Sequence, residues 1–431
     1  MKTSRIPGFY LLSIEQRIEK LAEVYELGVE EVEALSSQGA LALEQADKMI
    51  ENAVGIYSLP MGVGANFLIN DKEYLVPMAI EEPSVVAAAS FAAKIIRCAG
   101  GFKTTSTEPL MIGQIQVVHC DDFEAAGAAV LAAKADLIAE GNQYVANLVT
   151  RGGGVKDIEV RQLGSPESPY GQMLVVHILI DTCDAMGANL INTTAEGLAP
   201  SIEKLTGGRV YLRILSNLAD RRLAKATVEI PPHCFNTSKL KGEDVIEGIV
   251  LAQNFAMLDP YRAVTHNKGV MNGVDAVIMA TGNDWRSVEA AAHAYAARSG
   301  QYRAMTEWYR NDAGNLVGEL ELPMAVGIVG AAVSLHPMSQ IALKFLRVRS
   351  ARELAEVCVC VGLAQNLSAI RALATDGIQK GHMALHARTV AMTAGATGDM
   401  IDELAAQLVS LKDVSVSRAR QILEEQTAPT P

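Results

Sequence analysis

Residues 171–190, GQMLVVHILIDTCDAMGANL, decide the fold of this chain. The apolar run up to Ile180 predicts a strand, and the small residues after Asp184 predict a turn into a helix that starts near Gly187. Small residues at such a turn let a ligand approach the backbone, and a helix N-terminus offers N–H groups to a phosphate. By itself the hexapeptide DAMGAN, 184–189, fits an ordinary strand-to-helix turn equally well.

The same alternation of strand and helix continues on both sides of this stretch. Strands are expected at 111–120, 155–163, 171–183 and 210–216, helices at 121–149 and 186–207, and a turn at 151–154. The resulting order, β-α-β-β-α-β, is that of a ferredoxin-like domain. The sequence therefore predicts an α+β fold, in which this small domain is inserted into a larger, mainly helical one.

Helical patterns flank the predicted insertion. Leu21, Val24, Leu27 and Val32 recur at helical spacing within a run of short amphipathic helices, and helices dominate from residue 243 onward. A glycine-rich break at 377–381 precedes the last segment. We expect large-domain parts at 1–109 and 218–376, the small domain at 110–217, and a C-terminal helical flap at 377–431.

Composition limits the classes of partner. Of the 431 residues, 49% are hydrophobic and 20% charged, which is typical of a globular protein. The net charge of -12 is spread along the chain without a basic block, which argues against nucleic acid and anionic membranes as partners. No apolar run suggests a membrane span or a signal peptide, so a cytoplasmic protein is expected. The six cysteines form no CxxC pair, and reduced thiols are expected.

Two adjacent carboxylates, Glu81 and Glu82, stand between an apolar strand and an alanine-rich helix that should begin at Pro83 and stop at Gly100. Acids at that position stabilise the N-terminal end of a helix through its dipole. Alternatively, a carboxyl group beside an apolar strand and a second acid has a raised pKa and can donate a proton at neutral pH.

Polar side chains are concentrated in residues 259–286, DPYRAVTHNKGVMNGVDAVIMATGNDWR. Lys268 lies in an apparent polar loop, and Asp284 ends an apolar run. A lysine in a loop is usually solvated, but one that is held near a carboxylate is a fixed positive charge for an oxyanion. The density of polar groups favours a functional site here.

Two histidines, His382 and His386, lie four residues apart in GHMALH. That spacing suits a metal ion, but there is no H-E-x-x-H pattern and no obvious third ligand, so no metal is expected. His382 instead suits a catalytic histidine on a mobile segment. Neither a G-x-G-x-x-G turn after a strand nor a Walker A pattern is present.

Taken together, these segments resemble the hydroxymethylglutaryl-coenzyme A reductase family, of the second class found in bacteria and archaea. The resemblance is carried, in order along the chain, by ENAVGIYSLPMGVGANF at 51–67, EEPSVVAAAS at 81–90, DAMGANLINT at 184–193, RILSNLAD at 213–220, DPYRAVTHNKGVMNG at 259–273, TGNDWR at 281–286, VGLAQNLSAIRALAT at 361–375 and GHMALHAR at 381–388. Within the family it is most similar to the soluble enzymes of mevalonate-oxidising bacteria.

The resemblance implies roles for particular residues. The implied catalytic side chains are Glu82, Lys268, Asp284 and His382; those that hold the hydroxymethylglutaryl group are Ser84, Arg262 and Asn272; and those at the nicotinamide dinucleotide are Asp184, Met186, Gly187, Ala188, Asn189 and Asn217. It also implies homodimers that share their active sites at the interface, often assembled into hexamers, and a C-terminal flap that closes over substrate.

The implied chemistry explains these residue types. Reduction of a thioester to an alcohol takes two hydride transfers, and each puts negative charge on an oxygen that Lys268 can stabilise. Glu82 would supply the proton, Asp284 would hold Lys268 and couple its titration to that of Glu82, and His382 would protonate the departing coenzyme A thiolate. Glu81 is then expected to be only a helix-cap charge.

Several alternatives remain open at this point. Mevalonate oxidation is the expected direction, with mevalonate formation as the alternative; a lyase or isomerase that uses Glu81 and Glu82, or a non-catalytic scaffold, is a weaker hypothesis. Either NAD(H) or NADP(H) is expected to serve, with NAD(H) narrowly preferred. The resemblance places Val145 where relatives that select NAD have an aspartate, Glu140 lies one or two turns earlier, and Arg151 suits a 2′-phosphate.

Overall fold

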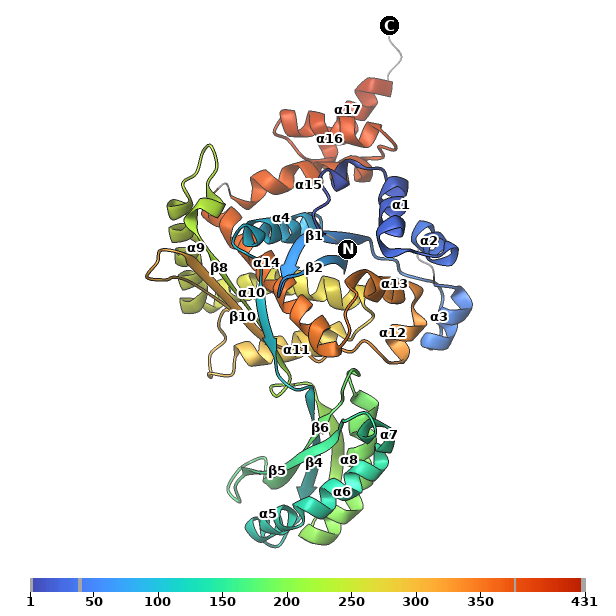
Figure 1. The fold of residues 1–431 in the computed structure, drawn as a ribbon, viewed down its shortest axis with the longest axis vertical. Coiled ribbons are helices and arrows are strands. Elements are labelled where there is room, and N and C mark those ends of the chain that lie inside the picture. Colours follow the sequence, from blue (N-terminus) through green and yellow to red (C-terminus); the bar gives the residue numbers. More distant parts are fainter. Residues whose placement is uncertain (1–2, 38–40, 376, 428–431) are drawn as a thin grey trace.

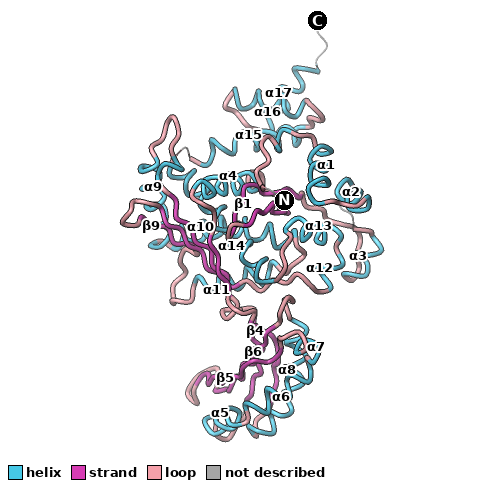
Figure 2. The backbone as a smooth tube through the Cα atoms, viewed as in Figure 1, coloured by secondary structure: helices cyan, strands magenta, loops and turns pink. Residues whose placement is uncertain are grey.

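The computed structural model describes residues 3–37, 41–375 and 377–427. Figure 1 shows a broad body of helices and strands, from which a smaller α+β unit extends at one end of the long axis, while a group of three helices lies at the other end. Figure 2 shows that the strands of the body and those of the smaller unit form separate groups. The predicted α+β class is confirmed.

The smaller unit is built on a four-stranded antiparallel sheet in the order β5-β6-β4-β7. Its strands are β4 (Leu110–Val118), β5 (Gly154–Gly164), β6 (Gln172–Asp181) and β7 (Arg209–Ser216), and its helices are α5 (Phe123–Ala132), α6 (Lys134–Tyr144), α7 (Ala146–Val149) and α8 (Ala188–Thr206). This order is that of the ferredoxin-like arrangement, as predicted. The one helix expected at 121–149 is instead three helices, which are separated at Ala133 and Val145.

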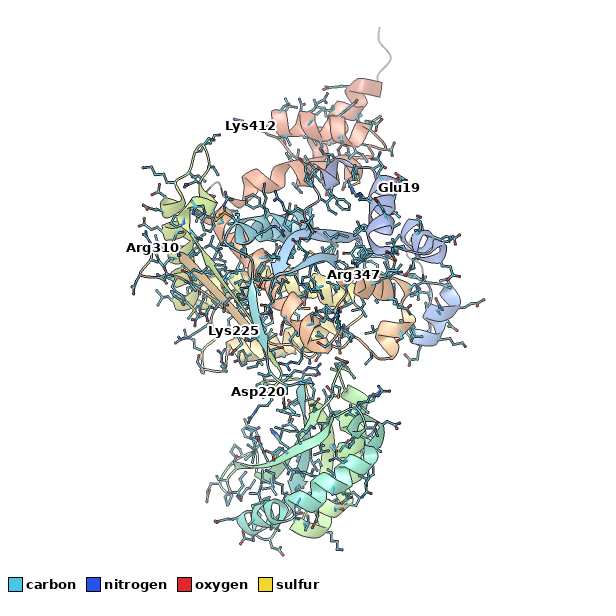
Figure 3. The ribbon with its side chains drawn as sticks, viewed as in Figure 1. Glu19, Asp220, Lys225, Arg310, Arg347 and Lys412 are labelled. Carbon is cyan, nitrogen blue, oxygen red and sulfur yellow. A yellow bond between two sulfur atoms is a disulfide. The ribbon has the colours of Figure 1, made fainter. Side chains whose placement is uncertain are left out.

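The body contains more β structure than the sequence suggested. A second antiparallel sheet, in the order β3-β8-β10-β9, consists of β3 (Lys103–Ser106), β8 (Leu223–Ile230), β9 (Thr306–Arg310) and β10 (Leu316–Pro323). Because β3 precedes the small unit and β8 follows it, their pairing closes the chain at the base of the insertion. Figure 3 shows Asp220 and Lys225 at this junction.

Two long helices form the centre of the body, α10 (Pro260–Ala280) and α14 (Ala351–Ala374), which pack against each other. Gly273 of α10 allows this contact, since a Cβ atom there would lie 2.7 Å from the carbonyl oxygen of Val361. The other helices of the body are α4 (Val85–Cys98), η2 (Pro232–Phe235), α9 (Gly242–Leu258), α11 (Trp285–Ala296), α12 (Ala331–Leu335) and α13 (Pro337–Leu346).

The N-terminal part adds short helices and a hairpin. The helices are η1 (Phe9–Leu11), α1 (Ile14–Tyr25), α2 (Val29–Ser36) and α3 (Leu43–Met49), and the strands are β1 (Met61–Ile69) and β2 (Lys72–Ala79). The hairpin turns at Asn70 and Asp71, which both have positive φ, as a tight two-residue turn requires. Leu21 and Tyr25 of α1 pack on α13 near Phe345, and Figure 3 shows Glu19 and Arg347 on this side of the body.

The C-terminal helices have a core of their own. In α15 (Ile378–Ala394), α16 (Met400–Ser410) and α17 (Val416–Thr427), buried side chains such as Val390, Leu404 and Ile422 contact one another. This agrees with the predicted helical flap, and Figure 1 shows the three helices beside α1 at the end of the molecule opposite the small unit.

Two expectations about the chain need correction. Cys98 and Cys234 are joined as a disulfide, whereas all six cysteines were expected to be reduced; the two residues are 136 positions apart, so their spacing gave no sign of the pair. In addition, α14 is long and apolar enough to cross a membrane, but about 67% of its most apolar window is buried within the structure, as in the core helix of a folded domain.

Candidate active site

Lys268 and Glu82 form an ion pair at the centre of the candidate site. Glu82 lies in the short loop between β2 and α4, and Lys268 lies in the middle of α10. The Glu82 side chain is 36% exposed and that of Lys268 is 59% exposed, so the pair faces an open surface that a substrate can reach. The two residues that the resemblance assigned to the proton and to the oxyanion are therefore in direct contact.

The helical setting of Lys268 corrects the expectation of a polar loop. The Asp259 carboxylate accepts hydrogen bonds from the backbone N–H groups of Tyr261 and Arg262, and Pro260 occupies the first helical position. This N-terminus starts a helix of 21 residues, which continues to Ala280. Since a helix fixes side-chain directions, Lys268 is held more firmly than a lysine in a loop.

Some polar side chains of α10 belong to the core rather than to the site. His266 Nε2 lies 2.6 Å from Thr306 Oγ1 and 3.0 Å from Asn366 Nδ2, and Asn267 binds the backbone of Arg303 and Met305. Burial, with the charge of Arg262 as a second cause, lowers the pKa of His266 to about 3. His266 is thus a neutral histidine that ties α10 to β9.

Ser84 is held in an unusual state beside Glu82. Its φ of 76° is in the left-handed region, which is unfavourable for a residue with a side chain. Its hydroxyl oxygen is buried without a hydrogen-bond partner among the described residues. A strained residue with an unsatisfied hydroxyl group next to an ion pair is typical of a binding site. The same conformation makes α4 begin at Val85, two residues later than predicted, and Glu81 makes no cap contact with the part of the chain that the structure describes.

Arg262 and Asn272 lie on α10 on either side of Lys268. The Arg262 side chain forms no ion pair within the described part of the chain, and partial burial lowers its pKa. Asn272 is one helical turn beyond Lys268, on the same face. An unpaired guanidinium group in this position suits a carboxylate ligand.

Asp284 does not make the expected contact with Lys268. Its Oδ1 accepts hydrogen bonds from the backbone N–H groups of Arg286 (3.1 Å) and Ser287 (3.2 Å), at the start of α11. The Arg286 guanidinium is 3.4 Å away. No ion pair joins Asp284 to Lys268 in the described residues, because the carboxylate is used as the N-terminal cap of α11.

The turn at 184–189 leads into α8 as predicted. Gly187 has a φ of 100°, and a Cβ atom there would lie 2.3 Å from Thr182 Cγ2, so only glycine fits. No side chain caps α8, so the N–H groups at Ala188 and Asn189 are offered by a helix of 19 residues without a competing side chain. The predicted dinucleotide residues therefore surround a helix N-terminus that suits a phosphate.

Two other residues predicted to lie at the cofactor, Asp184 and Asn217, tie the small unit to the body. The Asp184 carboxylate accepts a hydrogen bond from the backbone N–H of Ala351 at 2.8 Å, and Asn217 Oδ1 accepts one from the hydroxyl of Ser287 at 3.0 Å. Because Ser287 lies in α11, three residues after Asp284, Asn217 connects the proposed cofactor side with the proposed catalytic side.

Sequence reasoning missed two residues that hold this turn in place. Arg222 is buried, and its guanidinium donates to Thr182 Oγ1, to the carbonyl oxygens of Ala185 and Met186, and to that of Val326. Burial lowers the pKa of Arg222 to about 10.

The second of these residues is Asn283, which exchanges two hydrogen bonds with the backbone of Gly327 (2.7 and 3.0 Å). The feature of the sequence that could have pointed to Asn283 is its position next to Asp284 in TGNDWR.

The proposed selectivity position needs correction. Val145 is only 3% exposed and belongs to the core of the small unit, so it cannot contact a cofactor. The Glu140 carboxylate accepts a hydrogen bond from the hydroxyl group of Ser201. Arg151 is exposed in the turn before β5, and its carbonyl oxygen lies 3.7 Å from Cys183 Sγ, directly before the Asp184 turn. Of these three residues, Arg151 is the one that contacts the residue directly before the Asp184 turn.

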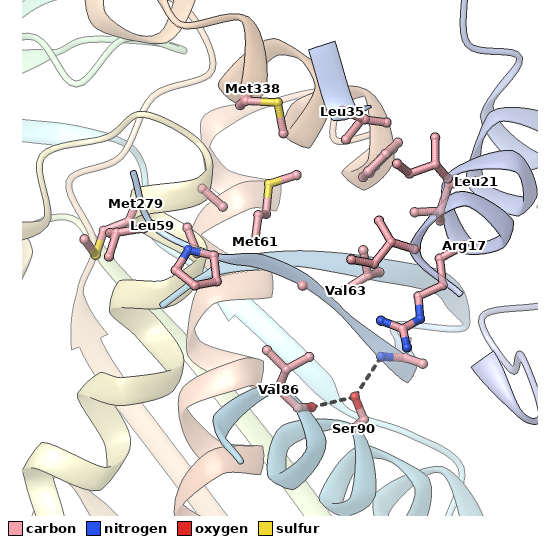
Figure 4. A pocket seen from close by; sticks show the side chains of 18 of the residues that line it. Arg17, Leu21, Leu35, Leu59, Met61, Val63, Val86, Ser90, Met279 and Met338 are labelled. Atoms are coloured by element: carbon pink, nitrogen blue, oxygen red, sulfur yellow. Dashed lines mark hydrogen bonds between the residues drawn. The ribbon is translucent and has the colours of Figure 1, made fainter. Parts of the chain in front are cut away.

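The two histidines of GHMALH fall in α15. The side chain of His382 lies outside the described residues, and His386 is exposed. A cavity of about 1510 Å³ lies in the body, between α1, β1, α4 and α13 (Figure 4). It is lined by Asn283 and Trp285, on either side of Asp284, but not by Glu82 or Lys268.

Comparison with known proteins identifies the family of this chain. The family model for hydroxymethylglutaryl-coenzyme A reductase matches residues 13–387. The chain belongs to this family. It is 52% identical to the 3-hydroxy-3-methylglutaryl-coenzyme A reductase of Archaeoglobus fulgidus, over 98% of this chain and 94% of that protein. A probable reductase of Borreliella burgdorferi is 38% identical over 79% of this chain and 77% of its own length.

Solved structures of this reductase family agree with the fold. A reductase of Streptococcus pneumoniae superimposes with a TM-score of 0.82 at 42% identity, covering 85% of this chain and 98% of that one. A class II reductase from the same species, described as bound to NADPH in open conformations, gives a TM-score of 0.82 at 41% identity, over 86% of this chain and 99% of that one. The chain is an NAD(P)H-dependent oxidoreductase, as predicted.

Proposed function

We propose that this reductase interconverts hydroxymethylglutaryl-coenzyme A with mevalonate and free coenzyme A, in two successive hydride transfers. The observation that carries the proposal is the Lys268–Glu82 ion pair, which lies beside the unsatisfied Ser84 hydroxyl group. A cation and a carboxyl group in contact on an accessible surface are what repeated reduction and protonation of a carbonyl group need.

Lys268 stabilises the negative charge that develops on the substrate oxygen at each hydride transfer. Glu82 delivers the proton that this oxygen finally takes up. The hydrogen bond between Lys268 and Glu82 keeps both side chains beside the same substrate oxygen. Asp284 acts from the start of α11. Because Lys268 and Glu82 pair without Asp284, the contribution of Asp284 to catalysis is separate from that of the pair. A variant at Asp284 is needed to measure it.

The substrate is held by groups for which the described residues show no side-chain partner. We assign the 3-hydroxy and carboxylate groups of the hydroxymethylglutaryl moiety to Ser84, Arg262 and Asn272. The unpaired Arg262 guanidinium supports this assignment, since it matches a carboxylate in charge and shape. His382 protonates the departing coenzyme A thiolate and is brought in by the C-terminal helices.

The nicotinamide dinucleotide binds at the N-terminus of α8, next to the residues of the Asp184–Asn189 turn and Asn217. The bound nicotinamide supplies the hydride. The uncapped N-terminus and Gly187, which has no side chain and a positive φ, support this site, because both favour the close approach of a diphosphate. Both NAD(H) and NADP(H) are proposed to serve; the NADPH bound in the Streptococcus pneumoniae structure supports use of the phosphorylated cofactor.

A second copy of the chain completes the site. The segment 51–60 contains neither helix nor strand, and its apolar side chains Val54 and Tyr57 are 102% and 88% exposed. Apolar groups this exposed favour a protein–protein contact. Light scattering of the purified protein is expected to show a dimer or a multiple of it, and the Val54→Asp variant is expected to weaken that assembly.

One assay tests the proposed reaction. Mevalonate, coenzyme A and oxidised nicotinamide are mixed with the protein, and the absorbance of the reduced nicotinamide is followed. Its appearance supports the reductase reaction, whereas a lyase, an isomerase or a scaffold would leave it unchanged. Comparing kcat/KM in this direction with that for hydroxymethylglutaryl-coenzyme A reduction tests the sequence-based expectation of mevalonate oxidation.

A further inference from the structure

Three metal-binding side chains meet on the surface of the body, away from the proposed active site. Cys98 is the last residue of α4, and His233 and Cys234 lie in η2. Their two Sγ atoms and one imidazole nitrogen all lie within 4.8 Å of one another. The Cys98–Cys234 disulfide uses two of these donors and leaves the third unexplained.

His233 is that third donor. Its Nε2 lies 3.6 Å from Cys234 Sγ, and it makes no other side-chain hydrogen bond with the described residues. A disulfide that only connects two segments needs no imidazole group beside it. A histidine nitrogen within 4.8 Å of two cysteine sulfurs is instead the donor set of a metal site.

Both segments that carry these donors are held firmly. Phe235 of η2 is buried in the core of the body, and η2 is so close to α9 that a Cβ atom at Gly242 would lie 1.8 Å from the carbonyl oxygen of Pro232. On the other side, Ile95 and Ile96 anchor the end of α4 in the same core. Cys98 and His233 are exposed and Cys234 is half-buried, so an ion can reach the donors.

We propose that Cys98, His233 and Cys234 bind a thiophilic divalent cation such as Zn²⁺, and that the disulfide is the oxidised, metal-free form of this site. Zn–S bonds of about 2.3 Å and Zn–N bonds of about 2.0 Å in tetrahedral geometry separate neighbouring donors by roughly 3.5 to 3.8 Å. The observed 3.6 Å between sulfur and nitrogen matches this spacing. Three protein ligands leave the fourth position for water.

The two forms are related by a balanced reaction. A dithiol or phosphine reductant supplies two electrons, and two protons are taken up as the disulfide becomes two thiols. The cation then binds both sulfurs as thiolates, and the two protons are released. The site therefore responds both to the redox state and to the metal concentration.

The position of the site separates it from catalysis. Glu82 lies beyond the other end of α4, whose 14 residues span about 21 Å at 1.5 Å per residue. The bound cation is too far away to take part in the reaction at Lys268. Its effect is to fasten the end of α4 to η2, so the metal stabilises the folded chain.

The test uses the full chain after reduction with a phosphine under anaerobic conditions. Cobalt(II) is added as the probe, and its thiolate charge-transfer absorbance is followed; Zn²⁺ is then added to displace it. One equivalent per chain is expected, together with a higher melting temperature. Cys98→Ser and Cys234→Ser are expected to abolish the signal, and His233→Ala to weaken binding at least about 10-fold.

Two controls make the result decisive. Cys120→Ser removes a half-buried free thiol elsewhere and should leave binding unchanged. The oxidised protein should bind no cobalt. If the reduced wild-type chain takes up no stoichiometric metal, or if the signal survives in the Cys98→Ser/Cys234→Ser double variant, the proposal is overturned. His233→Ala keeps both thiols and tests the site even if a cysteine variant does not fold.

Discussion

The Lys268 ammonium donates a hydrogen bond to Oε2 of Glu82 across 186 positions of sequence, and so links the middle of α10 to the loop before α4. Neither group belongs to the hydrophobic core. Because both side chains are partly exposed, their pairing contributes little to stability, and the two groups share one location at which an oxyanion can form and be protonated.

Removing either member of this pair should disable turnover without unfolding the chain. Lys268→Ala and Glu82→Gln are each expected to lower kcat at least about 100-fold, the scale for loss of an oxyanion donor or a general acid. Circular dichroism should show unchanged folding. Glu81→Gln is the matched control, since Glu81 is the exposed neighbouring acid, and it should keep most of the activity. Near-wild-type turnover in Glu82→Gln would remove Glu82 from the mechanism.

Ser84 should show opposite effects on stability and on substrate binding. In Ser84→Gly the backbone keeps its φ of 76° without the steric cost of a side chain, which is about 1 kcal/mol, so the melting temperature should rise slightly. The same variant loses the buried hydroxyl group, and KM for hydroxymethylglutaryl-coenzyme A should rise. Ser84→Ala should raise KM without the gain in stability. An unchanged KM in both variants would show that this hydroxyl does not touch the substrate.

Asp275 should make the chain less stable as the pH rises. Burial is the main cause that raises the pKa of its carboxyl group to about 9, and a hydrogen bond with Glu289 adds to it; Glu289 in turn pairs with His293 at 2.7 Å. Between about pH 4 and pH 9 the folded chain keeps a proton that the unfolded chain releases. The free energy of unfolding therefore falls as the pH rises through this window.

The Asp275→Asn variant tests this linkage. It keeps a neutral donor towards Glu289, so its melting temperature should vary less with pH and exceed that of the wild type at pH 8. Asp312→Asn, at an exposed position, should leave the pH profile unchanged. A wild-type profile that is flat from pH 5 to 9 would contradict the shifted pKa of Asp275.

His382 should matter for only one of the two half-reactions. If it protonates the departing thiolate, His382→Gln should strongly reduce turnover of the thioester. Reduction of free mevaldehyde, which has no thiolate to release, should be largely spared. His386→Gln, one helical turn later, is the matched control. Equal losses of both activities in His382→Gln would point to a structural role.

The sequence predicted the small unit well because its pattern is local. Runs of apolar residues and intervening helices define β4, β5, β6, α8 and β7 without reference to the rest of the chain. The second sheet was missed since it depends on distant pairing: β8 lies between β3 and β10, and its residues are more than 80 positions from those of β10.

The same distinction explains the outcome at the site. The density of polar side chains made the region of Lys268 look like a loop, yet it is a helix, in which Gly273 lets α10 pack closely on α14. Tertiary packing overrode local propensity at this position. The Glu82–Lys268 contact was expected only through the family resemblance, and the cap formed by Asp284 was not expected, because both depend on where separate elements meet.

Cofactor selectivity should depend on Arg151 rather than on Val145. Val145 is packed in the core, so Val145→Asp would bury a charge and lower the melting temperature instead of testing selectivity.

Arg151 is exposed on the turn that contacts Cys183, directly before the proposed dinucleotide turn, and its guanidinium group has no partner among the described residues. One ion pair with a 2′-phosphate is worth about 1 to 3 kcal/mol, or roughly 5- to 150-fold in kcat/KM. Arg151→Gln should therefore lose about that much with NADPH and little with NADH, while Arg161→Gln, an exposed arginine on β5, should change neither. An equal loss with both cofactors would place Arg151 at the diphosphate that NADH and NADPH share, and no loss with either would remove it from the cofactor site.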